Sequence, residues 1–422
     1  MLSVSQRTER GTDMIWKIVV IAAAVLVWLW QLFLARLSMR SKDRPIPETV
    51  RDVYDGETYR RRILYSAEKN RLGMWKATAG FAVDLAFLVF NVYAAFAGLF
   101  DPDPWRQMFG VMLLFMIGSL VSIPFDWYDT MRIEQKYGFN RTKAGTFVAD
   151  RVKELVLRFG LLLGLGSMLM GLHRSFGNWL ILLFAAFATL ILLFFAFIFP
   201  FFSRIFNKFK PLEDGELREK LTALLEKNGY RVRAINVMDA SRRSTKANAY
   251  FAGFGRTKTI VLYDTLVEAM TTDEIVAVFA HELGHGLHKD TLKNQFLTFF
   301  EMLILGVLAW GVLKLPALFH AFGFTADVNY GFALIVILSA GLEFLWPLLG
   351  LVGNWVSRRA EYRADAHAVK EGYGEALISA LKKLARQNYN DLAPSPLLVA
   401  LTYSHPTLAQ RIDAIRKSGS AE

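Results

Sequence analysis

Long apolar runs alternate with strongly charged loops along this chain of 422 residues. A transmembrane helix needs about 20 mostly apolar residues to cross a hydrocarbon core of roughly 30 Å. Seven stretches approach or meet that length, at residues 14–34, 77–100, 109–124, 155–172, 179–202, 296–319 and 331–355. We therefore predict a mainly α-helical, polytopic membrane protein with seven spans.

The placement of basic residues predicts the orientation of these spans. The loops after the first and third spans are rich in Lys and Arg, whereas the loops after the second and fourth carry only Arg106 and Arg174. Loops rich in Lys and Arg stay in the cytoplasm. The N-terminus should thus lie outside and the C-terminus in the cytoplasm. The net charge of +11 then reflects cytoplasmic loops near anionic lipid, and no nucleic-acid partner is expected.

Two polar regions interrupt the membrane pattern and predict a small α+β domain on the cytoplasmic side. Residues 211–228 have helical periodicity, and residues 231–238, 247–254 and 258–263 resemble strands. We predict four parts: membrane helices one to five with their loops (1–202), a first piece of the α+β domain (203–295), membrane helices six and seven (296–356) and a helical C-terminal piece (357–422).

The sequence HELGH at residues 281–285 predicts a metal site within this domain. Residues four apart lie on one face of a helix, so His281 and His285 can reach one metal ion, with Glu282 beside a bound water. H-E-x-x-H on a helix is the zinc-metalloprotease signature. Thr271 and Glu274 can form a capping box, which would start the helix near Thr272.

A catalytic zinc needs a third protein ligand and one open position. The chain has no cysteine, which excludes thiolate ligands, disulfides and thiol catalysis. Glu361 is one candidate, and Asp365, four residues on, would accept a hydrogen bond from a ligand histidine. His288 and His367 are alternatives. Two spans separate His285 from Glu361, so both return to the same membrane face.

At this point the chain resembles the type I CAAX prenyl endopeptidases, which are polytopic zinc proteases of the gluzincin class. The resemblance rests on HELGH before the sixth span and SRRAE (357–361) after the seventh, together with IEQKYGFN (133–140), FNKF (206–209), NAYF (248–251) and the His-Pro pair at 405–406. It implies a ring of seven helices around a large water-filled chamber, capped by a zincin-like protease domain.

The resemblance also implies roles for individual residues. His281, His285 and Glu361 would bind one Zn²⁺, and Glu282 would be the general base. The remaining roles go to Asn248, which would hold the substrate backbone, to His405, which would sit near the developing oxyanion, and to Asp365, which would support a ligand or donate a proton. Without the resemblance, Asn248 can be interpreted as a turn-forming residue, and His405 as part of a His-Pro turn at the start of a helix.

The leading interpretation is an integral-membrane zinc endopeptidase that cleaves near the C-terminus of prenylated or other membrane-associated substrates. The rivals are a quality-control protease of the HtpX type, a site-two intramembrane protease and a non-enzymatic membrane scaffold with a dead zinc site. The absence of cysteine and of a retention tail favours a bacterial inner membrane over the endoplasmic reticulum. Asp84, Glu301 and Glu343 lie inside predicted spans, where they either line a wet chamber or pair with Arg158 or Lys314.

Overall fold

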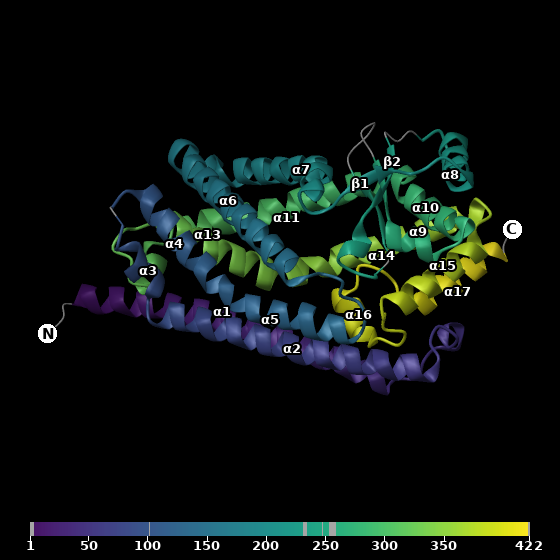
Figure 1. The fold of residues 1–422 in the computed structure, drawn as a ribbon. Helices are drawn as coiled ribbons and strands as arrows, with labels where there is room; N and C mark the ends of the chain where they lie inside the picture. Colours follow the sequence, from purple (N-terminus) through teal and green to yellow (C-terminus); the bar gives the residue numbers. More distant parts are fainter. Residues whose placement is uncertain (1–3, 101, 231–233, 247, 253–258, 421–422) are drawn as a thin grey trace.

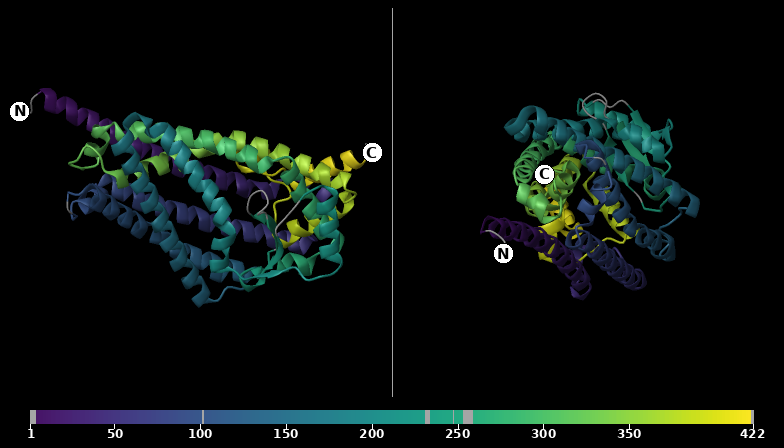
Figure 2. Two further views of the ribbon diagram at one scale, coloured as in Figure 1. Left: turned by 90° about the horizontal axis from the view of Figure 1, so that it is seen from above. Right: turned by 90° about the vertical axis from the view of Figure 1, so that its left-hand side faces the viewer.

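A computed structural model describes residues 4–100, 102–230, 234–246, 248–252 and 259–420. Most of the predicted spans correspond to long helices that run lengthwise through the molecule, and the small sheet lies at the end where the C-terminus is found (Figure 1). Seen from above, the two termini lie at opposite ends of this elongated shape (Figure 2). The apolar and polar regions of the sequence therefore separate along the long axis.

Long apolar helices form the membrane part of the protein. They are α1 (Val4–Arg40), α2 (Gly56–Val89), α4 (Pro104–Ser119), α6 (Ala144–Phe176), α7 (Leu180–Phe206), α11 (Asp290–Leu313), α13 (Tyr330–Leu338) and α14 (Trp346–Lys370). Short helical elements connect them: α3 (Val92–Ala97), α5 (Ile123–Tyr128), a π-helical turn (Asp129–Glu134) and α12 (Pro316–Ala321). A second π-helical turn, Ser339–Leu345, joins α13 to α14.

Six helical stretches of the described residues are long and apolar enough to cross a membrane: Asp13–Asp43, Gly56–Val89, Pro104–Glu134, Ala144–Phe194, Asp290–Leu313 and Tyr330–Lys370. The fourth stretch comprises α6 and part of α7, where the sequence predicts two spans, 155–172 and 179–202; in the structure a short 3₁₀ turn, Gly177–Trp179, separates the two helices. The protein is thus a multi-pass membrane protein. Seven spans around a chamber, and the side on which the α+β part lies, stay predictions.

Close helix packing in the membrane part depends on small residues. Gly306 of α11 faces α7, and a Cβ atom at Gly306 would lie 2.6 Å from the carbonyl oxygen of Ile181. Large side chains such as Met108, Phe319 and Phe332 are fully buried in the hydrophobic core of the membrane part.

The α+β part contains one four-stranded sheet in the order β1-β2-β4-β3. Its strands are β1 (Phe209–Pro211), β2 (Ala234–Met238), β3 (Ala249–Ala252) and β4 (Thr259–Tyr263), and only the β2–β4 pair is parallel. All three predicted strands are present in the residues described, although residues 231–233, 247 and 253–258 lie outside them. The predicted helix 211–228 is shorter, α8 (Glu216–Lys227): Pro211 is the last residue of β1, and residues 212–215 connect it to the helix.

Helices cover the sheet and complete this part of the protein. They are α9 (Asp264–Ala269), α10 (Thr272–Leu287), α15 (Gly374–Gln387), α16 (Pro396–Thr402) and α17 (Leu408–Gly419), together with the end of α14. Their core includes Phe279, Leu283 and Ile412, and it also takes in Val50 and Val53 from the loop after α1. The division of the chain into four parts at residues 202, 295 and 356 stays a prediction.

Candidate metal centre

The metal-site helix α10 forms where its local sequence predicts. The side chain of Thr271 accepts a hydrogen bond from the backbone N–H of Glu274, and the Glu274 carboxylate accepts one from the backbone N–H of Thr271. This capping box satisfies two of the free N–H groups at the helix start. His281 is 6% exposed in the buried face of α10, and His285 follows one turn later on the same side.

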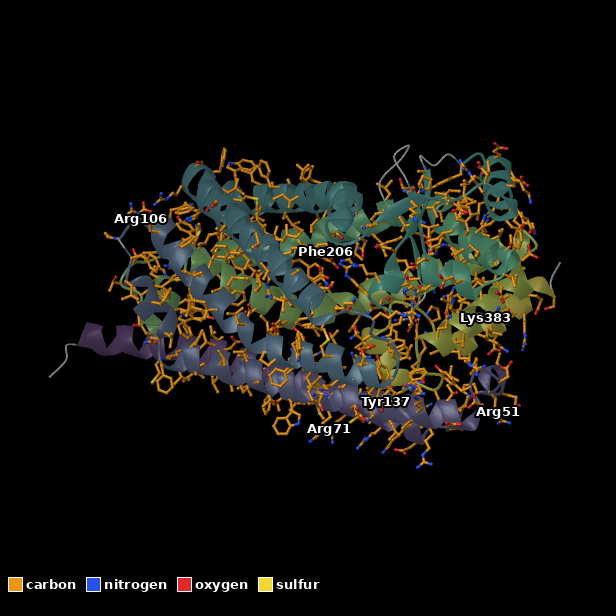
Figure 3. All side chains as sticks on the ribbon, viewed as in Figure 1. Arg51, Arg71, Arg106, Tyr137, Phe206 and Lys383 are labelled. Atoms are coloured by element: carbon orange, nitrogen blue, oxygen red, sulfur yellow. The ribbon has the colours of Figure 1, made fainter. Side chains whose placement is uncertain are left out.

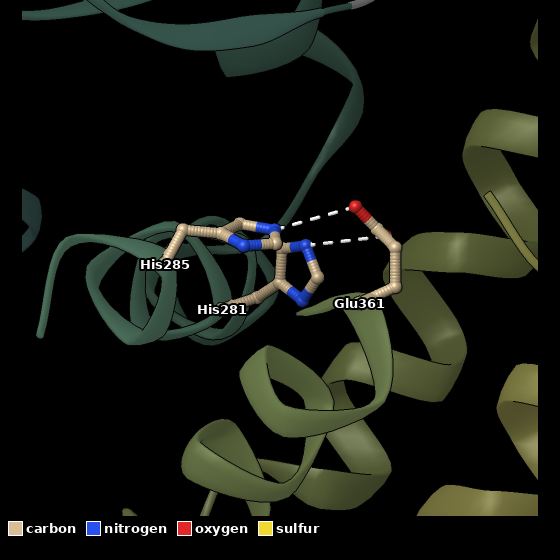
Figure 4. A group of neighbouring side chains, drawn as sticks. All are labelled: His281, His285 and Glu361. Carbon is tan, nitrogen blue, oxygen red and sulfur yellow. Dashed lines mark ion pairs between the residues drawn. The ribbon is translucent and has the colours of Figure 1, made fainter. Parts of the chain in front are cut away.

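Gly284 allows α14 to approach this face of α10. A Cβ atom at Gly284 would lie 2.9 Å from the Cα of Ala364 and 3.0 Å from the Cβ of His367, so a larger residue would force the two helices apart. Ala364 is fully buried at the contact. The close crossing brings Glu361, one turn before Ala364, against the two histidines, as Figure 4 shows.

The three predicted ligands converge. His281 Nε2 lies 3.6 Å from Glu361 Oε2, and His285 Nε2 lies 3.3 Å from Glu361 Oε1. One ligand atom from each residue lies within 4.8 Å of the other two. Ligand atoms about 2.1 Å from a tetrahedral zinc are roughly 3.4 Å apart. The observed separations therefore fit one zinc ion with little movement of the side chains.

The chemistry of the donor atoms also fits a cation. Glu361 Oε2 is buried and takes part in no hydrogen bond, although the guanidinium of Arg411 lies 3.2 Å away. A buried carboxylate oxygen without a donor is costly, so it marks a place for a positively charged partner. Two imidazoles and one carboxylate are a ligand set found in catalytic zinc sites, where a fourth position stays open.

Each ligand histidine is oriented by a carboxylate on its far side. His281 Nδ1 lies 2.9 Å from Asp365 Oδ1, and His285 Nδ1 lies 3.0 Å from Asp290 Oδ2. With Nδ1–H donating to a carboxylate, Nε2 faces Glu361 and would present its lone pair to a metal ion bound between them. The structure thus places Asp365 in contact with His281, one of the two histidines of the predicted site. It adds Asp290, the first residue of α11, which sequence reasoning missed.

Arg411 of α17 is the second residue that sequence reasoning missed. Its guanidinium donates to both oxygens of Asp365, at 2.6 and 2.9 Å, and its side chain is 11% exposed. Arg411 follows His405 by six residues and lies on the polar side of a short amphipathic helix. An Arg in that position usually faces water, so no spacing rule links it to HELGH. Only the packing of α17 against α14 brings it to the site.

Buried charges shift the protonation of the site. The apolar segment that ends at Trp355 is followed by Arg358 and Arg359, so Glu361 and Asp365 lie beyond the predicted span. Burial disfavours the charged form of Glu361, but hydrogen bonds from His285 and His405 outweigh it and hold the pKa of Glu361 well below its usual range. Burial also opposes ionisation of Asp365, yet His281 and Arg411 lower its pKa.

The opposite shift occurs in the basic groups. Burial alone would lower the pKa of His285, but its contacts with Glu361 and Asp290 raise that pKa to about 9. Arg411 is likewise desolvated, while its hydrogen bonds to Asp365 and the charges of Glu361 and Glu282 raise its pKa. A field that attracts a proton this strongly also attracts a divalent cation.

The remaining predicted site residues lie at different distances from this centre. His405, in the loop between α16 and α17, places Nδ1 2.9 Å from Glu361 Oε1, and its side chain is 65% exposed. Glu282, which directly follows His281 in the sequence, is half-buried. Asn248 is exposed just before β3, where its side-chain oxygen accepts from the N–H of Ala249 and its carbonyl accepts from the N–H of Tyr263.

The alternative third ligands lie elsewhere. His288 is exposed at the end of α10, and the Cβ of His367 packs against Gly284 where α14 crosses α10. Neither belongs to the convergent group. Arg158 and Lys314 are predicted from the sequence as possible ion-pair partners for the acidic residues inside the spans. In the structure both lie over aromatic rings: Arg158 is 5.8 Å from the centre of the Phe115 ring, and Lys314 is 4.7 Å from the centre of the Trp310 ring.

Comparison with known families places two models in succession along the chain. Residues 35–208 match the model described as CAAX prenyl protease N-terminal, five membrane helices, and residues 211–418 match peptidase family M48. The boundary between the two matches falls at β1. The HELGH helix and Glu361 therefore both lie within the region matched by the peptidase model.

Curated relatives match nearly the full length. CAAX prenyl protease 1 homolog of Arabidopsis thaliana is 32% identical over 94% of this chain and 96% of its own, and CAAX prenyl protease 1 of Saccharomyces cerevisiae is 27% identical over 95% of both chains. The crystal structure of S. mikatae Ste24p superposes with a TM-score of 0.88 at 26% identity, covering 95% of this chain and 99% of the other. These relatives are eukaryotic, so the comparisons give no support to the expected bacterial inner membrane.

Proposed function

The chain belongs to peptidase family M48 and to its CAAX prenyl protease branch, and is thus a membrane metalloendopeptidase; from this premise we propose that it uses one zinc ion, held by His281, His285 and Glu361, to cleave CAAX-type substrates on the cytoplasmic side of the membrane. The observation that carries the proposal is the convergence of the three ligand atoms, within 4.8 Å, from two separate helices.

The remaining residues supply the steps of peptide hydrolysis. When bound, zinc would polarise the scissile carbonyl and acidify the attacking water. Glu282 accepts the proton of that water and passes it to the leaving amine. His405 is exposed beside Glu361 and donates to the developing oxyanion, a contact worth roughly 3 kcal/mol. Asp365 keeps His281 in the tautomer whose Nε2 is free.

The edge of the sheet supplies a place for the substrate. β3 is the last strand in the order β1-β2-β4-β3, and Asn248 immediately precedes it. An extended peptide can add to an exposed strand edge through main-chain hydrogen bonds. We assign Asn248 to this edge as a residue that holds the backbone of the substrate near the scissile bond.

The proposed orientation is supported by where the basic loops lie. Arg51, from the loop after α1, and Lys383, from α15, are found at the same end of the molecule, whereas Arg106 is found at the opposite end (Figure 3). The basic loops and the metal centre therefore share one end, which the positive-inside rule assigns to the cytoplasm. Because the chain has no cysteine, single cysteines at Lys383 and Arg106 would report this directly by labelling in sealed vesicles.

Purified full-length protein tests the activity. We expect a farnesylated CAAX peptide to be cleaved, cleavage to stop with a zinc chelator and return with added zinc, and Glu282→Gln to keep one zinc per chain while losing activity. Unchanged turnover in Glu282→Gln would exclude Glu282 as the base. Equal cleavage of unfolded membrane proteins without preference for the prenyl group would instead favour the HtpX type, and full zinc without any cleavage would indicate a scaffold.

A further inference from the structure

The segment at residues 133–140 has no part in the chemistry proposed above, yet it contacts the chain that leads into β3. It follows α5 through the π-helical turn Asp129–Glu134. The backbone N–H of Arg141 donates to the carbonyl of Arg243 at 3.0 Å, the N–H of Thr245 donates to the carbonyl of Phe139 at 3.2 Å, and Asn140 forms an antiparallel bridge with Ser244. The membrane part thus adds a short strand beside residues 243–245.

Lys246, the next residue, reaches back into the membrane part. Its ammonium donates to the hydroxyl of Tyr65 at 3.1 Å and lies 3.4 Å from Glu134 Oε2, at the end of the π-helical turn. The same ammonium lies 4.8 Å from the centre of the Phe139 ring. Glu134 accepts in turn from Tyr65, at 2.6 Å, and from Lys69, at 2.9 Å. The ion pair therefore belongs to a network that α2 also holds.

The surroundings make this pair stronger than a surface salt bridge. Tyr65, Ile133, Tyr137 and Phe139 are buried around it and pack against Tyr389. The side chain of Glu134 is 14% exposed and that of Lys246 is 36% exposed. Glu134, the more buried partner, is largely shielded from water, which strengthens its attraction to the partly exposed ammonium of Lys246.

The backbone of Lys246 connects this network to the substrate edge. The carbonyl of Lys246 accepts from the hydroxyl of Thr265, in α9, at 2.9 Å. Two residues later, the carbonyl of Asn248 accepts from the N–H of Tyr263 at 3.1 Å, which aligns the start of β3 with β4. Two residues of chain span at most about 7 Å, so Lys246 and Asn248 are joined by a short covalent link between the network and the start of β3.

We propose that the Glu134–Lys246 pair positions the edge strand on which the substrate lies, so that the membrane helices set the substrate affinity of the protease part. Lys246 is a positioning residue: it acts on the substrate through Asn248 and β3. It does not touch the metal ligands. This inference rests on the proposed function, because β3 must be the strand that receives the substrate.

The test compares Lys246→Met with the wild-type chain on a farnesylated CAAX peptide. Methionine keeps an unbranched apolar stem and removes the charge. We expect KM to rise about tenfold, kcat to stay within about twofold, and one zinc per chain to remain. Binding of the same peptide to the Glu282→Gln chain, with and without Lys246→Met, should weaken by the same factor, which separates affinity from turnover.

Companion variants distinguish positioning from general damage. Lys246→Arg keeps the charge and should restore the KM of the wild type, while Glu134→Gln should raise KM, and the double variant should be no worse than Lys246→Met alone. Lys227→Met is the matched control, because Lys227 pairs with the buried Glu371 at 2.7 Å in another part of the protease region, and it should leave KM unchanged.

Two results would overturn the inference. One is a wild-type KM in both Lys246→Met and Glu134→Gln; the other is a parallel fall of kcat and zinc content with the rise of KM, which marks a structural role. A wild-type chain that binds zinc but neither cleaves nor binds the peptide removes the proposed function itself, and with it the premise of this inference. Cleavage by the wild type together with an unchanged KM in the variants removes only the inference.

Discussion

Helices α10 and α14 both supply residues to the His281–His285–Glu361 group, our proposed zinc ligands, but they reach it in different ways. α10 starts at a capping box, buries one face and presents His281 and His285 through helical periodicity alone. α14 starts at Trp346 without a side-chain cap, continues from the π-helical turn that ends at Leu345, and brings Glu361 to the histidines where Gly284 lets the two helices touch. The first half of the site depends on local sequence, and the second half depends on topology and close packing.

The largest effect is expected when one proposed ligand is removed from each of the two helices. His285→Ala and Glu361→Ala should both lose the zinc, because the two remaining ligands hold it poorly. The rate of peptide cleavage should then fall roughly a thousandfold or more, which corresponds to several kcal/mol of lost transition-state stabilisation. Elemental analysis and peptide cleavage measure both effects. His288→Ala and His367→Ala are the controls and should keep one zinc per chain. Full zinc in Glu361→Ala, or its loss in either control, would place the third ligand elsewhere.

The next test removes the cation that balances the acids of α14. Arg411→Met leaves Asp365 and Glu361 buried with less compensating charge, which should cost about 3–5 kcal/mol in the metal-free protein. Zinc supplies positive charge to the same carboxylates, so the loss of thermal stability should be smaller with zinc than with a chelator. Arg386→Met, which removes an exposed pair with Asp55, should change stability by less than about 1 kcal/mol. An equal loss with and without zinc would contradict this coupling.

A smaller effect is expected from the carboxylates behind the two histidines. Asp365→Asn, in α14, and Asp290→Asn, in α11, should each lower zinc affinity about 10–100-fold, because each acid fixes the ring orientation of one ligand. Competition with a chelator of known affinity measures the change. Asp273→Asn, at the exposed start of α10, is the control. If the two variants bound zinc like the wild type, the histidines would be held by packing alone.

The contrast between local sequence rules in α10 and packing in α14 also explains which parts of the site could be predicted from the sequence. Thr271, Glu274 and the two histidines obey rules that operate within a few residues, so the structure confirms the start of α10 and the placement of both histidines on one face of it, while their role as ligands stays a proposal. Glu361 and Asp365 required the resemblance and the count of two spans before their place was clear. Arg411 and Asp290 were missed because they reach the site from other elements, and no local rule marks an Arg in a short amphipathic helix as buried.

The membrane part shows a similar limit. Apolar length placed helices at nearly all the expected positions, but hydropathy does not predict the π-helical turns at Asp129–Glu134 and Ser339–Leu345, where one extra residue per turn breaks the regular ladder. Likewise, the helix expected at 211–228 begins only at Glu216, because Pro211 pairs with Asn236 at the end of β1 and Gly215, with φ +154°, precedes the helix.

The smallest effect is expected at the capping box of α10, which is the part of the site that depends most on local sequence. Burial opposes ionisation of Glu274, but hydrogen bonds from Lys383, Ser379 and the N–H of Thr271 lower its pKa below the usual 4.5. A lowered pKa in the folded state means that the charged form stabilises the fold above the unfolded pKa, and that this contribution is lost as the pH falls through the folded value. Glu274→Gln should therefore cost about 1–2 kcal/mol at neutral pH and progressively less in acid.

Thermal unfolding of the metal-free protein, with a chelator present throughout, isolates this contribution from the loss of zinc in acid. The difference between the wild type and Glu274→Gln should shrink as the pH falls below about 4.5, while Glu216→Gln, at an exposed pair with Lys220, should show almost no difference at any pH. A gap that stayed constant with pH would mean that Glu274 stabilises α10 by its shape and hydrogen bonds, without its charge. The local half of the site would then rest on packing in the same way as α14 does.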